Sequence, residues 1–211
     1  LAAVTVLGAV AAVVYAQGGL TRAERYARYA LWGHVTHQLQ FHLWLHPKSP
    51  RANLLMAEAL IKNESQAGPE TVQRALAHLR QVPRDSELSA RSLTQEGRLR
   101  LFLLNQPSRA EDALSQALRI DGKYADANYV MWKLFDLTGR SHLAEPYFWR
   151  AYEGCTAEER PLRLREWYMS QFFPLTANPA LDFMMGFTKP RETPTALTEA
   201  NRLIRFRQAE P

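Results

Sequence analysis

Small and large apolar residues recur along this chain at helical spacing. A small residue, a large one four positions later and a small one three further on occur twice, as Ala110, Leu114 and Ala117 and as Ala144, Phe148 and Ala151. Each position of the second set lies 34 residues after its counterpart in the first. On a helix, the small side chains let a neighbouring helix approach, and the large one fills the gap one turn away. A fixed offset of this length predicts stacked helix-turn-helix repeats, each covering the apolar face of the next.

The same spacing occurs twice more toward the N-terminus, as Val35, Leu39 and His42 and, 37 residues later, as Val72, Leu76 and Leu79. Together with the turn residues, the pattern predicts helices over 22–46, 50–62, 70–81, 87–104, 108–120, 124–138 and 141–153. Thr21, Ser108 and Ser141 are the expected N-caps, and Glu24 and Glu111 stand three residues after the first two, at capping-box spacing. Gly139 is the expected turn of the last pair.

This arrangement resembles the tetratricopeptide repeat family, in which the second helix of each pair carries small, large and small residues and ends near a proline. Here the endings are Leu45-His-Pro47, Gln81-Val-Pro83 and Ile120-Asp-Gly122, and the glycine of the third departs from the family pattern. The resemblance implies an all-α fold, a right-handed superhelical stack of about four repeats over 21–155, the first of them partial. It also implies a concave groove that receives peptides.

Candidate contacts can be assigned to that groove. In the first helix of the fourth pair, Met131, Trp132 and Phe135 are expected to pack inward. The opposite face then places three residues in the groove as partner-binding candidates, Tyr129, Lys133 and Asp136, with Glu58 and Lys62 as their counterparts in the second pair.

Residues 1–20 begin with LAAVTVLGAVAAVVYA, which has no charged side chain. Extended through Leu20, a helix here spans the ~30 Å hydrocarbon core of a bilayer. We expect a transmembrane anchor in preference to a cleaved secretory signal or a buried soluble helix. Gly8, Ala12 and Ala16 lie four residues apart, a spacing that suits close packing on another membrane helix.

The C-terminal part of the chain is expected to close the stack. A helix within 156–174 would cap the repeats, since a terminal repeat must shield its apolar face from water. The extension over 175–211 contains the apolar segment ALDFMMGF and an amphipathic basic helix over 195–208.

Charge and composition exclude several function classes. The net charge is +5 and the pI about 9.5, but basic and acidic residues alternate through the middle of the chain, which indicates a solvated surface. Cys155 is the only cysteine, so no internal disulfide or paired-cysteine site is available. The sequence has no phosphate-binding glycine loop, nucleophile elbow, zinc-protease motif or calcium loop. We therefore expect no enzyme activity, no cofactor and no small-molecule substrate.

Four histidines within 32–46 raise one alternative. His42 and His46 are four residues apart and share a helical face, as His34 and His37 nearly do, so they could chelate a metal or haem. No carboxylate nearby completes a ligand set, which favours polar or interfacial histidines.

The sequence thus predicts a membrane-anchored scaffold for protein–protein interaction. It would be an accessory or assembly subunit of a larger membrane complex, such as a respiratory or photosynthetic one, with other subunits and the lipid bilayer as partners. The arginines after the anchor favour the cytoplasmic over the periplasmic side for the repeats. The alternatives are an electron-transfer or metal subunit using the histidine helix and, more weakly, a soluble module that binds nucleic acid through its basic tail.

Overall fold

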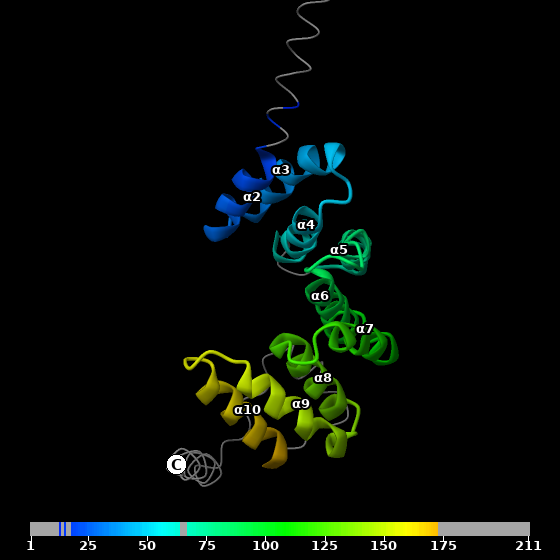
Figure 1. Cartoon of the computed structure of the whole chain (residues 1–211), viewed down its shortest axis with the longest axis vertical. Coiled ribbons are helices and arrows are strands. Elements are labelled where there is room, and N and C mark those ends of the chain that lie inside the picture. Colours follow the sequence, from blue (N-terminus) through cyan, green and yellow to red (C-terminus); the bar gives the residue numbers. More distant parts are fainter. Residues whose placement is uncertain (1–12, 14, 16–17, 64–66, 173–211) are drawn as a thin grey trace, which may run out of the picture. The chain divides into compact units, whose positions relative to one another are not determined.

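The structure is a computed structural model that describes residues 13, 15, 18–63 and 67–172. Every regular element in this part of the chain is an α-helix, which confirms the predicted all-α class. The helices, labelled in Figure 1, are α2 (Gly19–Arg28), α3 (Trp32–Leu45), α4 (Pro50–Asn63), α5 (Pro69–Arg80), α6 (Ser89–Phe102), α7 (Pro107–Ile120), α8 (Ala125–Leu137), α9 (Ser141–Glu153) and α10 (Arg160–Phe172).

Within the described ranges, no helix combines the length and the apolar character needed to cross a bilayer. The predicted anchor lies mostly outside those ranges, and Gly8, Ala12 and Ala16 lie wholly outside them. The predicted apolar segment and basic helix of 175–211 are outside them as well.

The described part of the chain forms two compact units that divide between Leu99 and Arg100, here called unit 1 and unit 2. In unit 1, α2 packs on α3, α3 on α4 and α4 on α5. In unit 2, α7 packs on α8, α8 on α9 and α9 on α10, and α8 and α9 lie side by side in Figure 1. In each of these pairs, helices that are neighbours in sequence are neighbours in space, as helical repeats require.

The predicted small–large–small positions form the core of this packing. All twelve, three each in α3, α5, α7 and α9, are buried, and none is more than 7 % exposed. The large members Leu39, Leu76, Leu114 and Phe148 are among the most fully buried side chains of the described residues. Met131, Trp132 and Phe135 are buried as well, as predicted.

The prediction of one helix over 22–46 is wrong, because the structure divides this range into α2 and α3. Ala30 between them has a positive φ of 55°, and the amides of Tyr29 and Ala30 donate to carbonyls three residues earlier, so the chain reverses. Gly19 allows α2 to approach α3 closely: a Cβ there would lie 3.0 Å from the carbonyl oxygen of Gln38 and 3.2 Å from Cβ of His42. Close contact between α2 and α3 at Gly19 completes the first helix pair.

The three predicted N-caps are also wrong. Helix α2 begins at Gly19, two residues before Thr21, and α7 begins at Pro107, one residue before Ser108. Proline has a helical φ and needs no amide partner in the first turn, so it displaces Ser108 as the start. Ser141 is the first residue of α9 rather than its cap, and its hydroxyl donates to Asp136 at 3.5 Å. Gly139 does form the predicted turn, with φ of +71°.

Two buried asparagines fix the turns that precede α4 and α8. Asn53 Nδ2 donates to the carbonyls of Pro47 and Ser49, at 2.7 and 3.0 Å. Asn128 Nδ2 donates to Gly122 and Tyr124, the corresponding carbonyls six and four residues earlier, at 3.1 and 3.0 Å. These bonds satisfy carbonyls that would otherwise be buried without partners, and they give the two units a common reference position.

Candidate partner-binding groove

A groove of about 630 Å³ lies within unit 1, lined by α2, α4, α5, α6 and the residues just before α6. Its apolar lining comes from leucine, isoleucine and alanine side chains, including Leu54, Leu55, Ile61, Leu88 and Leu99. Its polar lining comes from seven charged side chains and one amide: Glu24, Arg51, Glu58, Lys62, Glu87, Arg91, Gln95 and Arg98. A concave surface with apolar lining and polar groups is a common form of binding site.

The helices present this lining by regular spacing. Along α4 the groove residues Arg51, Leu55, Glu58 and Lys62 recur at intervals of four, three and four, and along α6 Arg91, Gln95 and Arg98 recur at four and three. Positions at these intervals share one helical face. The opposite faces of both helices are buried, so each helix has one face in the core and one in the groove.

Several of the groove charges are paired with one another. Arg51 lies 3.2 Å from Glu24, and Lys62 lies 2.6 Å from Glu58 and 4.6 Å from the ring centre of Trp32. Exposed pairs of this kind contribute only about 0–1 kcal/mol. A partner could therefore exchange them for its own charges at small cost.

The structure places both predicted residues of the second pair, Glu58 and Lys62, on the groove lining. Their contact with a partner stays a prediction. Sequence reasoning missed Arg51, Arg91, Gln95 and Arg98. The signal that could have found them is the four-and-three spacing of polar residues on the face opposite the core.

In unit 2 the predicted partner-binding residues of α8 do not line an open groove, because α10 packs over them. Tyr129 Oη donates to Glu166 Oε2 of α10 at 3.1 Å, and the Arg163 guanidinium lies 3.5 Å from the centre of the Tyr129 ring. Lys133 Nζ lies 4.1 Å above the Trp132 ring. Tyr129 and Lys133 thus have partners within unit 2, and any further contact with another protein stays a prediction.

Burial shifts the protonation equilibria of these side chains. It raises the pKa of Tyr129, with the Glu166 carboxylate adding to the effect. It also lowers the pKa of Lys133 and raises that of Asp136, because both charged forms lose water. The third predicted residue, Asp136, is partly buried and accepts the bond from Ser141.

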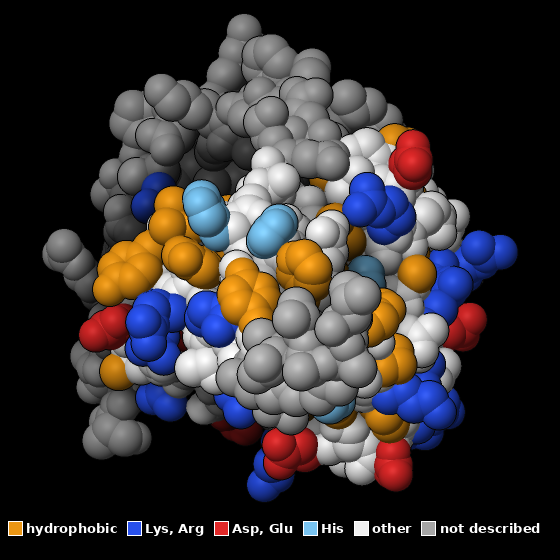
Figure 2. All heavy atoms as spheres, turned by 90° about the horizontal axis from the view of Figure 1, so that it is seen from above, with side chains coloured by type: hydrophobic (Ala, Val, Ile, Leu, Met, Phe, Trp, Pro, Cys, Tyr) orange, Lys and Arg blue, Asp and Glu red, His pale blue; other side chains and the backbone are white. Residues whose placement is uncertain are grey.

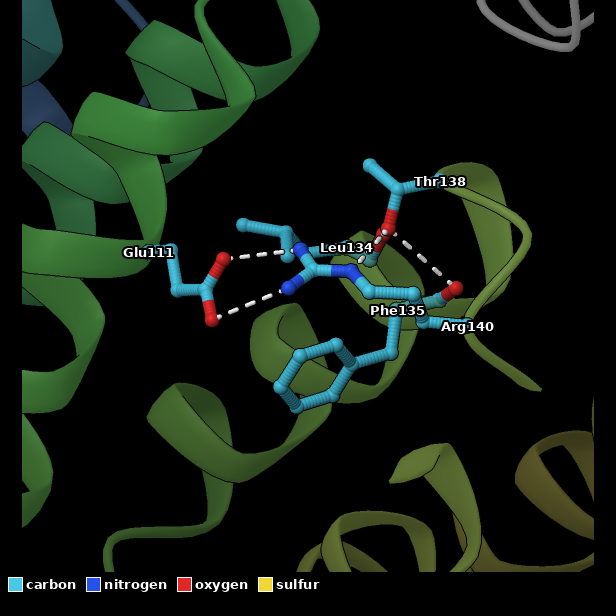
Figure 3. A network of polar contacts seen from close by, with 5 residues as sticks. All are labelled: Glu111, Leu134, Phe135, Thr138 and Arg140. Carbon is cyan, nitrogen blue, oxygen red and sulfur yellow. Dashed lines mark hydrogen bonds and ion pairs between the residues drawn. The ribbon is translucent and has the colours of Figure 1, made fainter. Parts of the chain in front are cut away.

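A polar network joins α7 to the turn between α8 and α9 (Figure 3). The Arg140 guanidinium donates to both oxygens of Glu111, at 3.2 and 2.7 Å, and its Nε donates to Thr138 Oγ1 at 3.0 Å. It also lies 4.7 Å from the ring centre of Phe135. Glu111 therefore links α7 to the α8–α9 pair and does not form the predicted capping box.

The histidines of α3 do not gather into a ligand set. The rings of His42 and His46 are 5.1 Å apart, and His42 is buried. His34 packs on Tyr26 and His37 on Phe41, with ring centres 5.2 and 5.4 Å apart. Throughout the described ranges, no group of three or more His, Cys, Asp or Glu side chains could hold a metal ion.

No protein-family model matches this chain, and no curated protein matches it either. The groove and the exposed surfaces are therefore the observations that bear on its function.

Proposed function

We propose that this chain is a protein-interaction module whose groove in unit 1 binds a segment of a partner subunit. The observation that carries the proposal is the groove itself: it combines apolar and mixed-charge lining on the exposed faces of α4 and α6. Arginine beside apolar side chains is typical of residues that dominate binding energy in protein interfaces.

The repeat architecture supports the same role. The helix pairs of each unit pack serially and bury the same small–large–small residues, as tetratricopeptide-like repeats would. On this proposal the pairs belong to a right-handed superhelical stack, whose concave side carries the groove.

The uncharged sequence of residues 1–16 supports a membrane tether, and the arginines that follow it favour the cytoplasmic side for the helical units. A tether raises the local concentration of the groove next to membrane partners, so a modest affinity is enough for stable assembly. The protein would then be an accessory or assembly subunit of a membrane complex. Deleting residues 1–16 should move the chain to the soluble fraction, and retention on membranes would contradict the tether.

The groove is tested by reversing one exposed charge. Arg91→Glu leaves the core intact and should remove the partner subunits that accompany the tagged chain when its complex is purified from native membranes. Arg109→Glu, which changes another exposed arginine, on α7, is the matched control and should keep them. Circular dichroism checks that both variants are folded. An unchanged set of partners with Arg91→Glu would contradict the proposed site.

A further inference from the structure

One face of α3 presents aromatic side chains to solvent. His34, His37, Phe41 and Trp44 follow one another at intervals of three, four and three residues, so they form a single stripe along the helix. All four are exposed, with Trp44 at 75 % and Phe41 at 46 %. The opposite face, with Val35, Leu39 and His42, is buried in unit 1. Large aromatic side chains that are exposed together in this way indicate a surface that binds a lipid bilayer or another molecule.

The stripe is joined to the end of the uncharged N-terminal sequence. Tyr15 packs edge-on against Phe41, with ring centres 6.0 Å apart, and its hydroxyl accepts a bond from Gln38 Nε2 at 3.0 Å. The Arg22 guanidinium lies 4.1 Å from the centre of the Tyr15 ring and donates to the Tyr15 carbonyl. If residues 1–16 are embedded in a bilayer, the apolar sequence ends at the membrane surface. The contacts of Tyr15 then hold Phe41 and Arg22 at that surface.

The charge around the stripe is positive. Residues 18–51 contain five lysines and arginines and one acidic residue, Glu24. Arg25, Arg28 and Lys48 are exposed, and Tyr29 beside them is 73 % exposed. Viewed from the end at which α2 and α3 are labelled in Figure 1, hydrophobic and histidine side chains lie together with lysines and arginines beside them (Figure 2).

We propose that α3 lies in the plane of an anionic bilayer surface, with Phe41 and Trp44 among the headgroups and the basic side chains against lipid phosphates. Aromatic residues prefer this depth, and lysines and arginines near an anionic surface are attracted to it. The proposal rests on the membrane tether proposed above. It assigns the stripe to lipid and leaves the groove to the partner protein.

The test uses the full chain with Cys155→Ser, reconstituted into vesicles of phosphatidylcholine with phosphatidylglycerol. Trp44→Cys carries a nitroxide label on the stripe, and Gln73→Cys carries the same label on the exposed face of α5 as the control. Collisions with a water-soluble relaxation agent are measured for each label. On vesicles, the label at 44 should lose most of its collisions relative to detergent, and the label at 73 should keep them.

Three other outcomes would overturn the proposal. If the chain floats with the vesicles and the label at 44 remains as accessible as the one at 73, the interfacial position of α3 is refuted while the tether stands. If the chain does not float, both proposals fail. If the label at 44 is shielded only in native membranes and never in pure lipid vesicles, a protein covers the stripe, and the assignment to lipid is wrong. A Phe41→Ser background should reduce the shielding on anionic vesicles.

Discussion

The same helical face is open in unit 1 and covered in unit 2. Glu58 stands five residues after the turn-fixing Asn53, and Lys133 stands five residues after the equivalent Asn128. Glu58 lines a groove of about 630 Å³, whereas Lys133 is half-buried on a face that α10 covers. Equivalent repeat positions therefore differ in role according to whether a later helix packs over them.

The cover on unit 2 is built from aromatic and charged contacts. Trp167 of α10 stacks on Phe148 of α9, with ring centres 5.4 Å apart. Glu166 of α10 accepts a hydrogen bond from the hydroxyl of Tyr129. A terminal helix of this kind shields the apolar face that no further repeat would cover. On the proposed function, the face that stays open binds the partner and the covered face closes the fold.

The largest loss of stability is expected when a large side chain of the small–large–small core, which both units share, is truncated. Phe148→Ala removes a fully buried ring and should lower the free energy of unfolding by about 3–5 kcal/mol, and Leu76→Ala in unit 1 by about 2–5 kcal/mol. Urea unfolding followed by circular dichroism measures both. Ile120→Ala, at a position 53 % exposed, is the control and should change it by about 0.5 kcal/mol or less. Equal effects at all three positions would contradict the predicted core.

Removing a contact between α10 and α8 should give the next largest loss of stability. Tyr129→Phe removes the hydroxyl that binds Glu166 and should destabilise unit 2 by about 1–2 kcal/mol, because the carboxylate loses a partly buried donor. Faster hydrogen exchange of α10 amides reports the loss. Tyr147→Phe keeps the ring that packs on Phe135 and serves as the control. Unchanged exchange in α10 would show that the Tyr129 bond does not hold this helix.

The ion pairs of the two units should differ in strength. A double-mutant cycle on Arg140 and Glu111 should give a coupling of about 1 kcal/mol, since the pair is bidentate and part of a network. The same cycle on Glu58 and Lys62, a more exposed pair four residues apart on one helix, should give about 0.3–0.5 kcal/mol. A stronger coupling in the groove pair would mean that its charges are not available for exchange with a partner.

The smallest effect is the pH dependence of stability that His78 of unit 1 contributes. Burial, and secondarily the charge of Arg74, lowers the pKa of His78 below 6.5, and His78 Nδ1 lies 2.9 Å from Oδ1 of Asn53. The unfolded chain therefore binds this proton more readily, so the contribution is complete above about pH 6.5 and is lost as the pH falls through the folded pKa. His78→Gln should flatten this part of the stability profile. An identical profile in the variant would exclude His78 as its source.

Sequence periodicity could predict most of the helices and their buried faces, because the spacing of apolar residues within a helix indicates which face is buried. The bounds of α9 and the burial of Leu114 and Phe148 follow from spacing alone. The reversal at Ala30 could not be predicted in this way. Alanine rarely adopts a positive φ, and the α2–α3 packing to which the reversal leads, at Gly19, is a contact between helices.

The groove was predicted only in part for a similar reason. Glu58 and Lys62 could be assigned to it through the repeat resemblance, but Arg91 and Gln95 come from α6, to which the resemblance assigned no groove residues. The sequence predicts a capping helix within 156–174, where α10 lies, but its contact with Tyr129 could not be predicted because α10 carries no repeat pattern. Which equivalent face stays open is therefore a property of tertiary packing.

The contrast between the two faces can be tested most directly by site-specific photo-crosslinking in native membranes. A photoreactive residue at Gln95, in the groove of unit 1, should join the chain to a partner polypeptide and raise its mass. The same residue at Lys133, beneath α10, should react only within the chain and leave its mass unchanged. Crosslinking to a partner from position 133 with none from position 95 would contradict the account.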